Sequence, residues 1–353
     1  MARPSTNDLD CLAGLLHGRR SRLAEGDRLD ALCHLRDLSE FSRAVDASAE
    51  SHAAAGLQRR LVEDFVLELG GILKYVEAEG ADLLAWILFR FQVENLKVLV
   101  RGLASHTPRQ ELKEHLIPLS TERALDSAAL AGAGSWAAFV ALAPQRTLSQ
   151  GLKRALELDP DRPRPFFLEA GLDCGYFQEL LARVQRLAGE DQELVKTLVL
   201  QEVDMFHLML VVRGRFHYDL RPESLLPWHC GGTGISRSRF AAMLAAPDPQ
   251  TAAEFALGRA LDVLPPKRES SEGGATVDPA ALEALAWRRF LRLSNRAFRR
   301  SHMGLGAVVG YVGIRRVELA NLITLSEAIR AGMTAEAIRP ELISRTDRVP
   351  VYV

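Results

Sequence analysis

The longest apolar stretch of the chain spans residues 83–103 and places hydrophobic side chains on nearly every side of a helix. Its polar interruptions are few: Arg90, Gln92, Glu94, Asn95, Lys97 and Arg101. A helix that is apolar on several faces has to be buried on several faces. We therefore expect this helix to pack against other helices of the chain, or to offer an apolar face that a partner protein covers.

Helix-forming residues dominate the rest of the chain, and no proline occurs between Pro4 and Pro108. A proline inside a helix costs roughly 3 kcal/mol, so a proline-free stretch rich in Ala, Leu, Glu and Arg favours long helices. Alternation of β-branched and polar residues between turns, which is typical of strands, is nearly absent. The tail 349–353 is the one segment that fits a strand. The sequence predicts an all-α protein.

One helical pattern recurs three times along the chain. It occupies residues 92–102, 204–214 and 318–328. When Asn95 is aligned with His207 and Asn321, the separations are 112 and 114 residues, close to a third of the 353-residue chain. A fixed spacing of this kind is the signature of a repeated structural unit. His207 stands where the other two copies have asparagine.

Shorter similarities accompany each copy. An Arg-Gly pair follows the aligned position in the first two copies, at Arg101 and Arg213, whereas the third copy has Glu327 at the arginine position. Residues 220–225 resemble residues 333–338, and Leu116-Ile117-Pro118 resembles Leu225-Leu226-Pro227. Upstream, an Ala/Leu-rich segment ends on Phe41, Phe139 or Phe255.

Each unit is thus predicted to contain a short helical entry, a long helical hairpin and a short exit helix. Three such domains fill the chain as residues 1–119, 120–232 and 233–353. Within the third, residues 265–279 carry almost no apolar side chain, so that we expect a mobile loop there.

Composition narrows the class of function. Hydrophobic residues make up 48% of the chain, as in a globular protein with a core, and 44 Lys and Arg nearly balance 45 Asp and Glu. That balance argues against a general nucleic-acid binder, which needs a basic excess. Residues 303–314 are the best membrane candidate but fall short of the roughly 20 apolar residues a span requires. With no apolar signal-peptide region near Met1 and no Cys-x-x-Cys pair among four cysteines, we expect a reduced protein that stays in the cytoplasm, where it could sit on a membrane complex.

Candidate chemistry is sparse. Neither Cys33-His34 nor His229-Cys230 can chelate a metal as a helical pair, because adjacent residues on a helix point about 100° apart. The glycines of residues 231–234 lack the Lys-Ser/Thr of a phosphate-binding loop, which favours a turn. His207 with Asp204 one turn before it could form a base and its orienting carboxylate, but asparagine at the aligned positions favours a structural polar role. We expect no catalytic, cofactor or metal site.

Taken together, residues 91–102 resemble the Asn-Leu…Arg signature of the C subunit of the bacterial and archaeal V-type (A-type) ATPases, called the d subunit in the eukaryotic enzymes. The resemblance continues through residues 204–227, 316–323 and 332–339. It implies a funnel of three helical domains about a pseudo-threefold axis, which sits on the membrane rotor ring and receives the central stalk. It also implies a mechanical role, with no catalytic residue, nucleotide or metal in this part of the enzyme.

Five repeat-motif positions are the candidate structural or interface residues: Asn95, Arg101, His207, Arg213 and Asn321. Two other functions stay open. One is an α-helical scaffold or regulator that keeps the repeat without the ATPase, and the other is a helical-bundle enzyme that uses His207 and Asp204.

Overall fold

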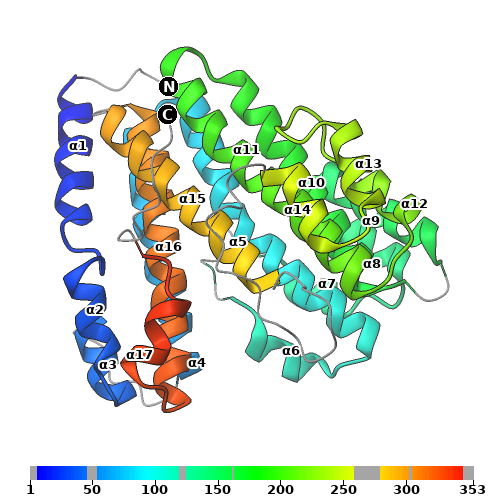
Figure 1. Ribbon diagram of the computed structural model, residues 1–353, viewed down its shortest axis with the longest axis horizontal. Coiled ribbons are helices and arrows are strands. Elements are labelled where there is room, and N and C mark those ends of the chain that lie inside the picture. Colours follow the sequence, from blue (N-terminus) through cyan, green and yellow to red (C-terminus); the bar gives the residue numbers. More distant parts are fainter. Residues whose placement is uncertain are drawn as a thin grey trace. The chain divides into compact units, whose positions relative to one another are not determined.

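The structure is a computed structural model that describes residues 6–45, 54–117, 119, 125–160, 163–257, 279–301 and 304–344. Within these ranges every regular element is helical (Figure 1), which confirms the all-α prediction. The loop predicted at 265–279 falls outside the described residues except for Pro279, and so does the tail 349–353. None of the described helices combines the length and the apolar character needed to cross a bilayer.

The helices follow one another along the chain as follows: α1 Thr6–Arg20, α2 Asp27–Cys33, α3 Leu38–Val45, α4 Ala54–Ile72, η1 Leu73–Tyr75, α5 Ala78–Ser105, α6 Arg109–His115, α7 Ser127–Ala131, α8 Trp136–Leu142, α9 Arg146–Leu158, α10 Pro165–Arg186, α11 Gly189–Val211, η2 Val212–His217, α12 Pro222–Leu225, η3 Leu226–Trp228, α13 Arg237–Ala245, α14 Pro249–Leu257, α15 Pro279–Arg300, α16 Leu305–Arg330, α17 Ala335–Ile338 and η5 Arg339–Glu341. The apolar stretch at 83–103 lies within α5, as its pattern predicts. The other two copies of the pattern lie on α11, with its π-helical continuation η2, and on α16. We call α5, α11 and α16 the motif helices.

Backbone contacts divide the chain into two compact units. The first combines residues 1–84, 187–198 and 284–353, and the second combines residues 85–186 and 199–283. The division into three domains at 1–119, 120–232 and 233–353 stays a prediction.

In the first unit, helices from both ends of the chain pack together. The N-terminal helices α1, α3 and α4 contact α16 near the C-terminus. Figure 1 shows the blue N-terminal and the red C-terminal helices within one group. The aromatic rings of Phe41, Phe65 and Tyr311 are fully buried here, and α16 is buried along most of its length.

In the second unit, α9 and α10 form the tightest helix pair. Gly151 on α9 faces Gly171 on α10, and a Cβ atom built on Gly151 would lie 2.0 Å from the Gly171 carbonyl oxygen. Gly175, one turn further along α10, meets the backbone of Thr147 in the same way. Because three glycines line the crossing, the two backbones touch directly, as at small-residue helix contacts elsewhere.

The short entry helices repeat more regularly than the sequence pattern indicates. Phe139 on α8 is fully buried, and it lies four residues after Ser135, whose hydroxyl accepts a hydrogen bond from the backbone at the helix start. Phe240 on α13 is also fully buried and lies four residues after the capping Ser236. Phe255 is 43% exposed. Phe240, and not Phe255, therefore corresponds to Phe139.

Candidate interface positions on the motif helices

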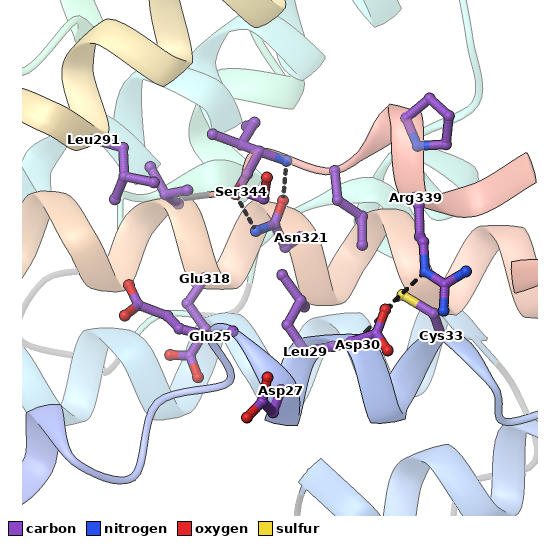
Figure 2. A pocket seen from close by; sticks show the side chains of 15 residues that line it. Glu25, Asp27, Leu29, Asp30, Cys33, Leu291, Glu318, Asn321, Arg339 and Ser344 are labelled. Carbon is purple, nitrogen blue, oxygen red and sulfur yellow. Dashed lines mark hydrogen bonds and ion pairs between the residues drawn. The ribbon is translucent and has the colours of Figure 1, made fainter. Parts of the chain in front are cut away.

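The two motif asparagines make the same pair of hydrogen bonds. Asn95 donates through Nδ2 to the Ile117 carbonyl oxygen at 2.9 Å and accepts at Oδ1 from the Ile117 N–H at 2.7 Å. Asn321 does the same with Ile343, at 2.9 Å for both bonds; Figure 2 draws both of these bonds as dashed lines. In each case the partner lies 22 residues further along the chain. The side-chain amide thus fastens the segment after the exit helix to the middle of its motif helix, as buried amides do when both polar ends are satisfied.

His207 takes the corresponding place in the second copy. Its Nε2 atom accepts a hydrogen bond of 2.9 Å from the backbone N–H of Cys230, 23 residues further on. The imidazole is fully buried and stacks on the ring of His229, with ring centres 4.8 Å apart. Because Nε2 accepts, the neutral ring carries its proton on Nδ1. Burial, with a smaller contribution from His229, lowers the pKa of His207 to about 3.

This geometry bears on the hypothesis of a His207–Asp204 base. The lone pair that a general base would use is engaged by the Cys230 N–H. The Asp204 carboxylate accepts from the N–H of Ile235 at 3.0 Å. Both side chains hold backbone segments, which agrees with the structural role that asparagine at the aligned positions favours.

The buried His207 predicts a dependence of stability on pH. Its pKa is lowered on folding, so below about pH 6.5 the unfolded ring binds a proton that the folded ring does not. The free energy of unfolding then decreases as the pH falls from 6.5 toward the folded pKa near 3. The slope is about 1.4 kcal/mol per pH unit, or about 2 kcal/mol between pH 6.5 and 5. Urea unfolding of the wild type and of His207→Asn across this range checks it: the variant should lose this slope, and parallel curves would contradict the assignment.

Positions three residues before the motif residue also repeat. Gln92 and Asp204 accept backbone N–H groups from Leu125 and Ile235, 33 and 31 residues downstream. In the third copy Glu318 accepts from the N–H of Ala24, near the start of the chain, at 2.5 Å. The motif helices of the first two copies thus hold the segment that leads into the entry helices of the next copy. The motif helix of the third copy holds the segment that leads into the entry helices of the first copy.

Positions six residues after the motif residue form the third repeated contact. Arg101 bonds Glu169 at 2.7 Å, and Arg213 bonds Glu283 at 2.8 Å, with both arginine side chains about half exposed. In the third copy Glu327 stands for arginine and accepts from the Gln58 amide at 2.7 Å. The partners Gln58, Glu169 and Glu283 are each the fifth residue of a long helix, namely α4, α10 and α15. Repeat one therefore contacts repeat two, repeat two contacts repeat three, and repeat three contacts repeat one.

A partly buried charge cluster connects α5 to α10. The Asp173 carboxylate lies 2.8 Å from Arg90 and 2.7 Å from Lys97, and Glu94 lies 2.6 Å from Arg90. The guanidinium of Arg90 also lies over the ring of Tyr176. Burial opposes ionisation of Asp173, but Arg90 and Lys97 outweigh it and hold the pKa of that carboxyl below its usual value.

An open hollow of about 730 Å³ brings two of the candidate residues together. Arg101 and Arg213 both line it, with Arg164 as a third guanidinium and Glu169 and Asp173 as carboxylates. Its remaining wall is largely apolar and aromatic, with side chains from α10, α11 and the segment that follows α11. Among the described residues, no three His, Cys, Asp or Glu side chains gather in a way that could hold a metal ion. The hollow offers mixed charge and aromatic surface, which suits contact with another protein.

Comparison with known proteins identifies the chain. The model of the ATP synthase (C/AC39) subunit family matches residues 12–341, nearly the whole length. The chain belongs to this family. A relative of this C/AC39 chain is the C subunit of the A-type ATP synthase of Haloferax volcanii, which is 22% identical over 309 residues and covers 86% of both chains. The resemblance that the motif residues carry is thereby confirmed.

Three of the five candidate positions in this C/AC39 protein, Asn95, His207 and Asn321, are buried and make equivalent backbone contacts. Arg101 and Arg213 lie at the surface and share one hollow. That any of the five contacts a partner stays a prediction. The sequence analysis did not predict Glu169 and Glu283 as the ion-pair partners of Arg101 and Arg213. The signal was present, because a glutamate follows the first arginine by 68 residues and the second by 70.

Proposed function

We propose that this C/AC39 protein is a non-catalytic part of a rotary V-type or A-type ATPase, in which it couples the central stalk to the membrane rotor ring during ion transport. The observation that carries the proposal is the threefold recurrence of one contact, Arg101–Glu169, Arg213–Glu283 and Glu327–Gln58. A part that transmits torque needs stiff helices and joints of the same kind between its repeats. Membership of the family and the name of the Haloferax relative supply the assembly in which such a part would act.

The order of these contacts supports a funnel of three domains. Each motif helix reaches a long helix of the following repeat, and the last repeat reaches the first. Asn95, His207 and Asn321 fasten each exit segment to its own motif helix, so that each repeat resists deformation internally. Buried polar side chains that bond the backbone in this way favour a single arrangement of helices.

The hollow around Arg101 and Arg213 is our candidate for the surface that receives the stalk. The Arg101 and Arg213 side chains are about half exposed, and the aromatic side chains of the hollow provide the contact area that protein interfaces favour. A mechanical role also agrees with His207, whose accepting nitrogen is engaged by backbone and whose ring is neutral at neutral pH.

Affinity purification of the tagged chain from detergent-solubilised membranes tests the function. We expect the rotor ring and the central-stalk proteins to be recovered together with it. A chain recovered without any rotary-ATPase component would refute the proposal and favour the scaffold or regulator alternative.

A double variant, Arg101→Ala/Arg213→Ala, tests the hollow separately. Exposed ion pairs contribute about 0–1 kcal/mol each, so the variant should fold. We expect the rotor ring to be recovered with this variant as with the wild type, and the recovery of the stalk proteins to fall at least about tenfold. Charged interface residues govern the specificity and the rate of association. The matched control is Lys153→Ala, an exposed cation on α9 that does not line the hollow. Equal retention of the stalk by variant and control would exclude the hollow as the receiving surface.

A further inference from the structure

Helix α15 carries a row of arginines on one face. Arg289, Arg292, Arg296 and Arg299 are all exposed, and we call them the arginine stripe. Their spacing of three, four and three residues keeps them within one side of a helix. Ten residues of helix place the first and last about 15 Å apart.

Within the part of the chain that the structure describes, the stripe lacks acidic partners. None of its four guanidinium groups forms an ion pair or a hydrogen bond with any residue in the described ranges. Other exposed arginines of the same unit do find partners: Arg300 lies 3.7 Å from Glu190, Arg330 bonds Glu327, and Arg339 bonds Asp30. Since the whole chain has a net charge of −1, a row of four arginines that have no partner among the described residues does not follow from a general basic excess.

The opposite side of α15 is held firmly against α16. Phe290, Leu291 and Phe298 are buried there. A Cβ atom on Gly310 of α16 would lie 2.5 Å from the backbone nitrogen of Phe298, and one on Gly313 would meet the Ser294 hydroxyl. The backbone that presents the stripe is therefore rigid, and the guanidinium spacing is preset, which lowers the entropic cost of binding along it.

We propose that the arginine stripe docks an acidic α-helix of a partner protein. A helix with Asp or Glu at three- and four-residue intervals presents carboxylates in the same row, and each guanidinium can bind a carboxylate in bidentate fashion. The inference rests on the proposed function and deepens it, since it gives the chemistry of one contact within the rotary complex.

The surroundings of the stripe favour a protein over an anionic membrane. Arg299 lines a surface hollow of about 690 Å³ together with Arg20, Glu25 and Asn295. Asp27, one residue beyond that wall, is exposed. Glu25 is ion-paired with Arg20, but an anionic lipid plane would still have to approach the exposed Asp27 carboxylate, whereas a single helix can follow the arginine row and leave Asp27 in solvent.

Zero-length cross-linking of Arg292→Lys/Arg296→Lys in the complex purified from membranes tests the proposal. A carbodiimide joins an amine to an adjacent carboxylate as an amide, but it does not couple a guanidinium, so the variant keeps the charge and gains reactivity. We expect new cross-links, absent in the wild type, to carboxylates spaced by three or four residues on a helix of one partner protein. The matched control is Leu67→Lys, which introduces a lysine on α4 at a residue that is 66% exposed. This lysine should form no cross-link to the partner helix.

The outcomes separate this inference from the proposed function, because recovery of the ATPase components is scored in the same sample. If the ATPase components are recovered but no lysine-dependent cross-link forms, the proposed docking of a helix on the arginine stripe is wrong, and the proposed coupling function is unaffected. Cross-links to the chain's own Glu269 or Glu272 would overturn it too, since the acidic groups would then come from this chain.

A charge-reversed variant provides the second measurement. Arg289→Glu/Arg292→Glu/Arg296→Glu should retain its helix content by circular dichroism, since no described partner is lost, and should reduce recovery of the cross-linked partner by at least about tenfold. Sedimentation with vesicles of phosphatidylcholine and phosphatidylserine in a 3:1 ratio completes the test. The wild-type chain could bind the vesicles and the charge-reversed variant could fail to do so, while recovery of the partner is unchanged. That result would show that the stripe binds a lipid surface and not an acidic helix.

Discussion

Replacing Asp173 by alanine is expected to lower the free energy of unfolding by about 1.5–3 kcal/mol. The carboxylate balances Arg90 and Lys97 at distances of 2.8 and 2.7 Å, and the Lys97 side chain is only 7% exposed. Removing the carboxylate leaves the buried Lys97 ammonium with only the more exposed Glu94 beside it, which costs more than the loss of a surface pair. Glu94 remains near both cations but does not replace the charge of Asp173.

Denaturant unfolding followed by circular dichroism measures the loss. The control is Arg330→Ala, which removes a surface ion pair with Glu327 on α16, where the Arg330 side chain is 62% exposed; this variant should lose less than about 1 kcal/mol. The pKa of Asp173 is lowered on folding, so its contribution is present above the unfolded pKa near 3.9 and disappears as the pH falls through the folded value. The gap between wild type and Asp173→Ala should therefore narrow only in strong acid. Equal effects of the two alanine variants at pH 7 would contradict the role of the cluster.

Substituting Gly151 by alanine is expected to destabilise the second unit by about 3 kcal/mol, the upper end of the range for overpacked sites. The added methyl group would lie 2.0 Å from the Gly171 carbonyl oxygen and 2.6 Å from its carbon. Both obstacles are backbone atoms, so α9 and α10 have to move apart along their contact. No side-chain rotation relieves the clash.

The control for this substitution is Gly14→Ala on α1, where a Cβ atom would meet nothing within 4 Å. There alanine should stabilise by about 0.4–1 kcal/mol, because it restricts the unfolded chain and suits a helix. Opposite signs for two identical substitutions in helices would show that the crossing, and not helix propensity, decides the result. Hydrogen exchange of α9 and α10 amides locates the effect, and unchanged protection of these helices in Gly151→Ala would contradict the tight crossing.

Local sequence patterns predicted the helices of this protein. They did not predict contacts between residues far apart in the sequence, which depend on how the helices pack. The absence of proline and the apolar stretch at 83–103 predicted α5, and alignment of Asn95 with Asn321 found two residues with equivalent hydrogen bonds. These signals are local, or repeat at a fixed spacing. The partners Glu169 and Glu283 lie about 70 residues from their arginines, and periodicity tells which face of a helix is buried without telling what covers it.

Long-range packing also explains one wrong assignment, Phe255, and one overlooked residue, Asp173. Phe255 matched the entry pattern by composition, but the position that the repeat buries is set by the capping residue four places earlier, which points to Phe240. Asp173 drew no attention because an isolated aspartate in a helix is ordinarily solvated. Only the packing of α10 against α5 places it between two cations.

The first unit is assembled from segments that the ribosome makes far apart in time. Residues 1–84 belong to it, but its last segment begins at residue 284, two hundred residues later. At roughly 5–20 residues per second, the apolar faces of α1, α3 and α4 wait roughly 12–50 s after residue 84 until α16 is complete at Arg330. The second unit, whose residues fall between 85 and 283, can form first. We expect nascent chains stalled before residue 284 to hold a protease-resistant second unit and an N-terminal segment that binds chaperones.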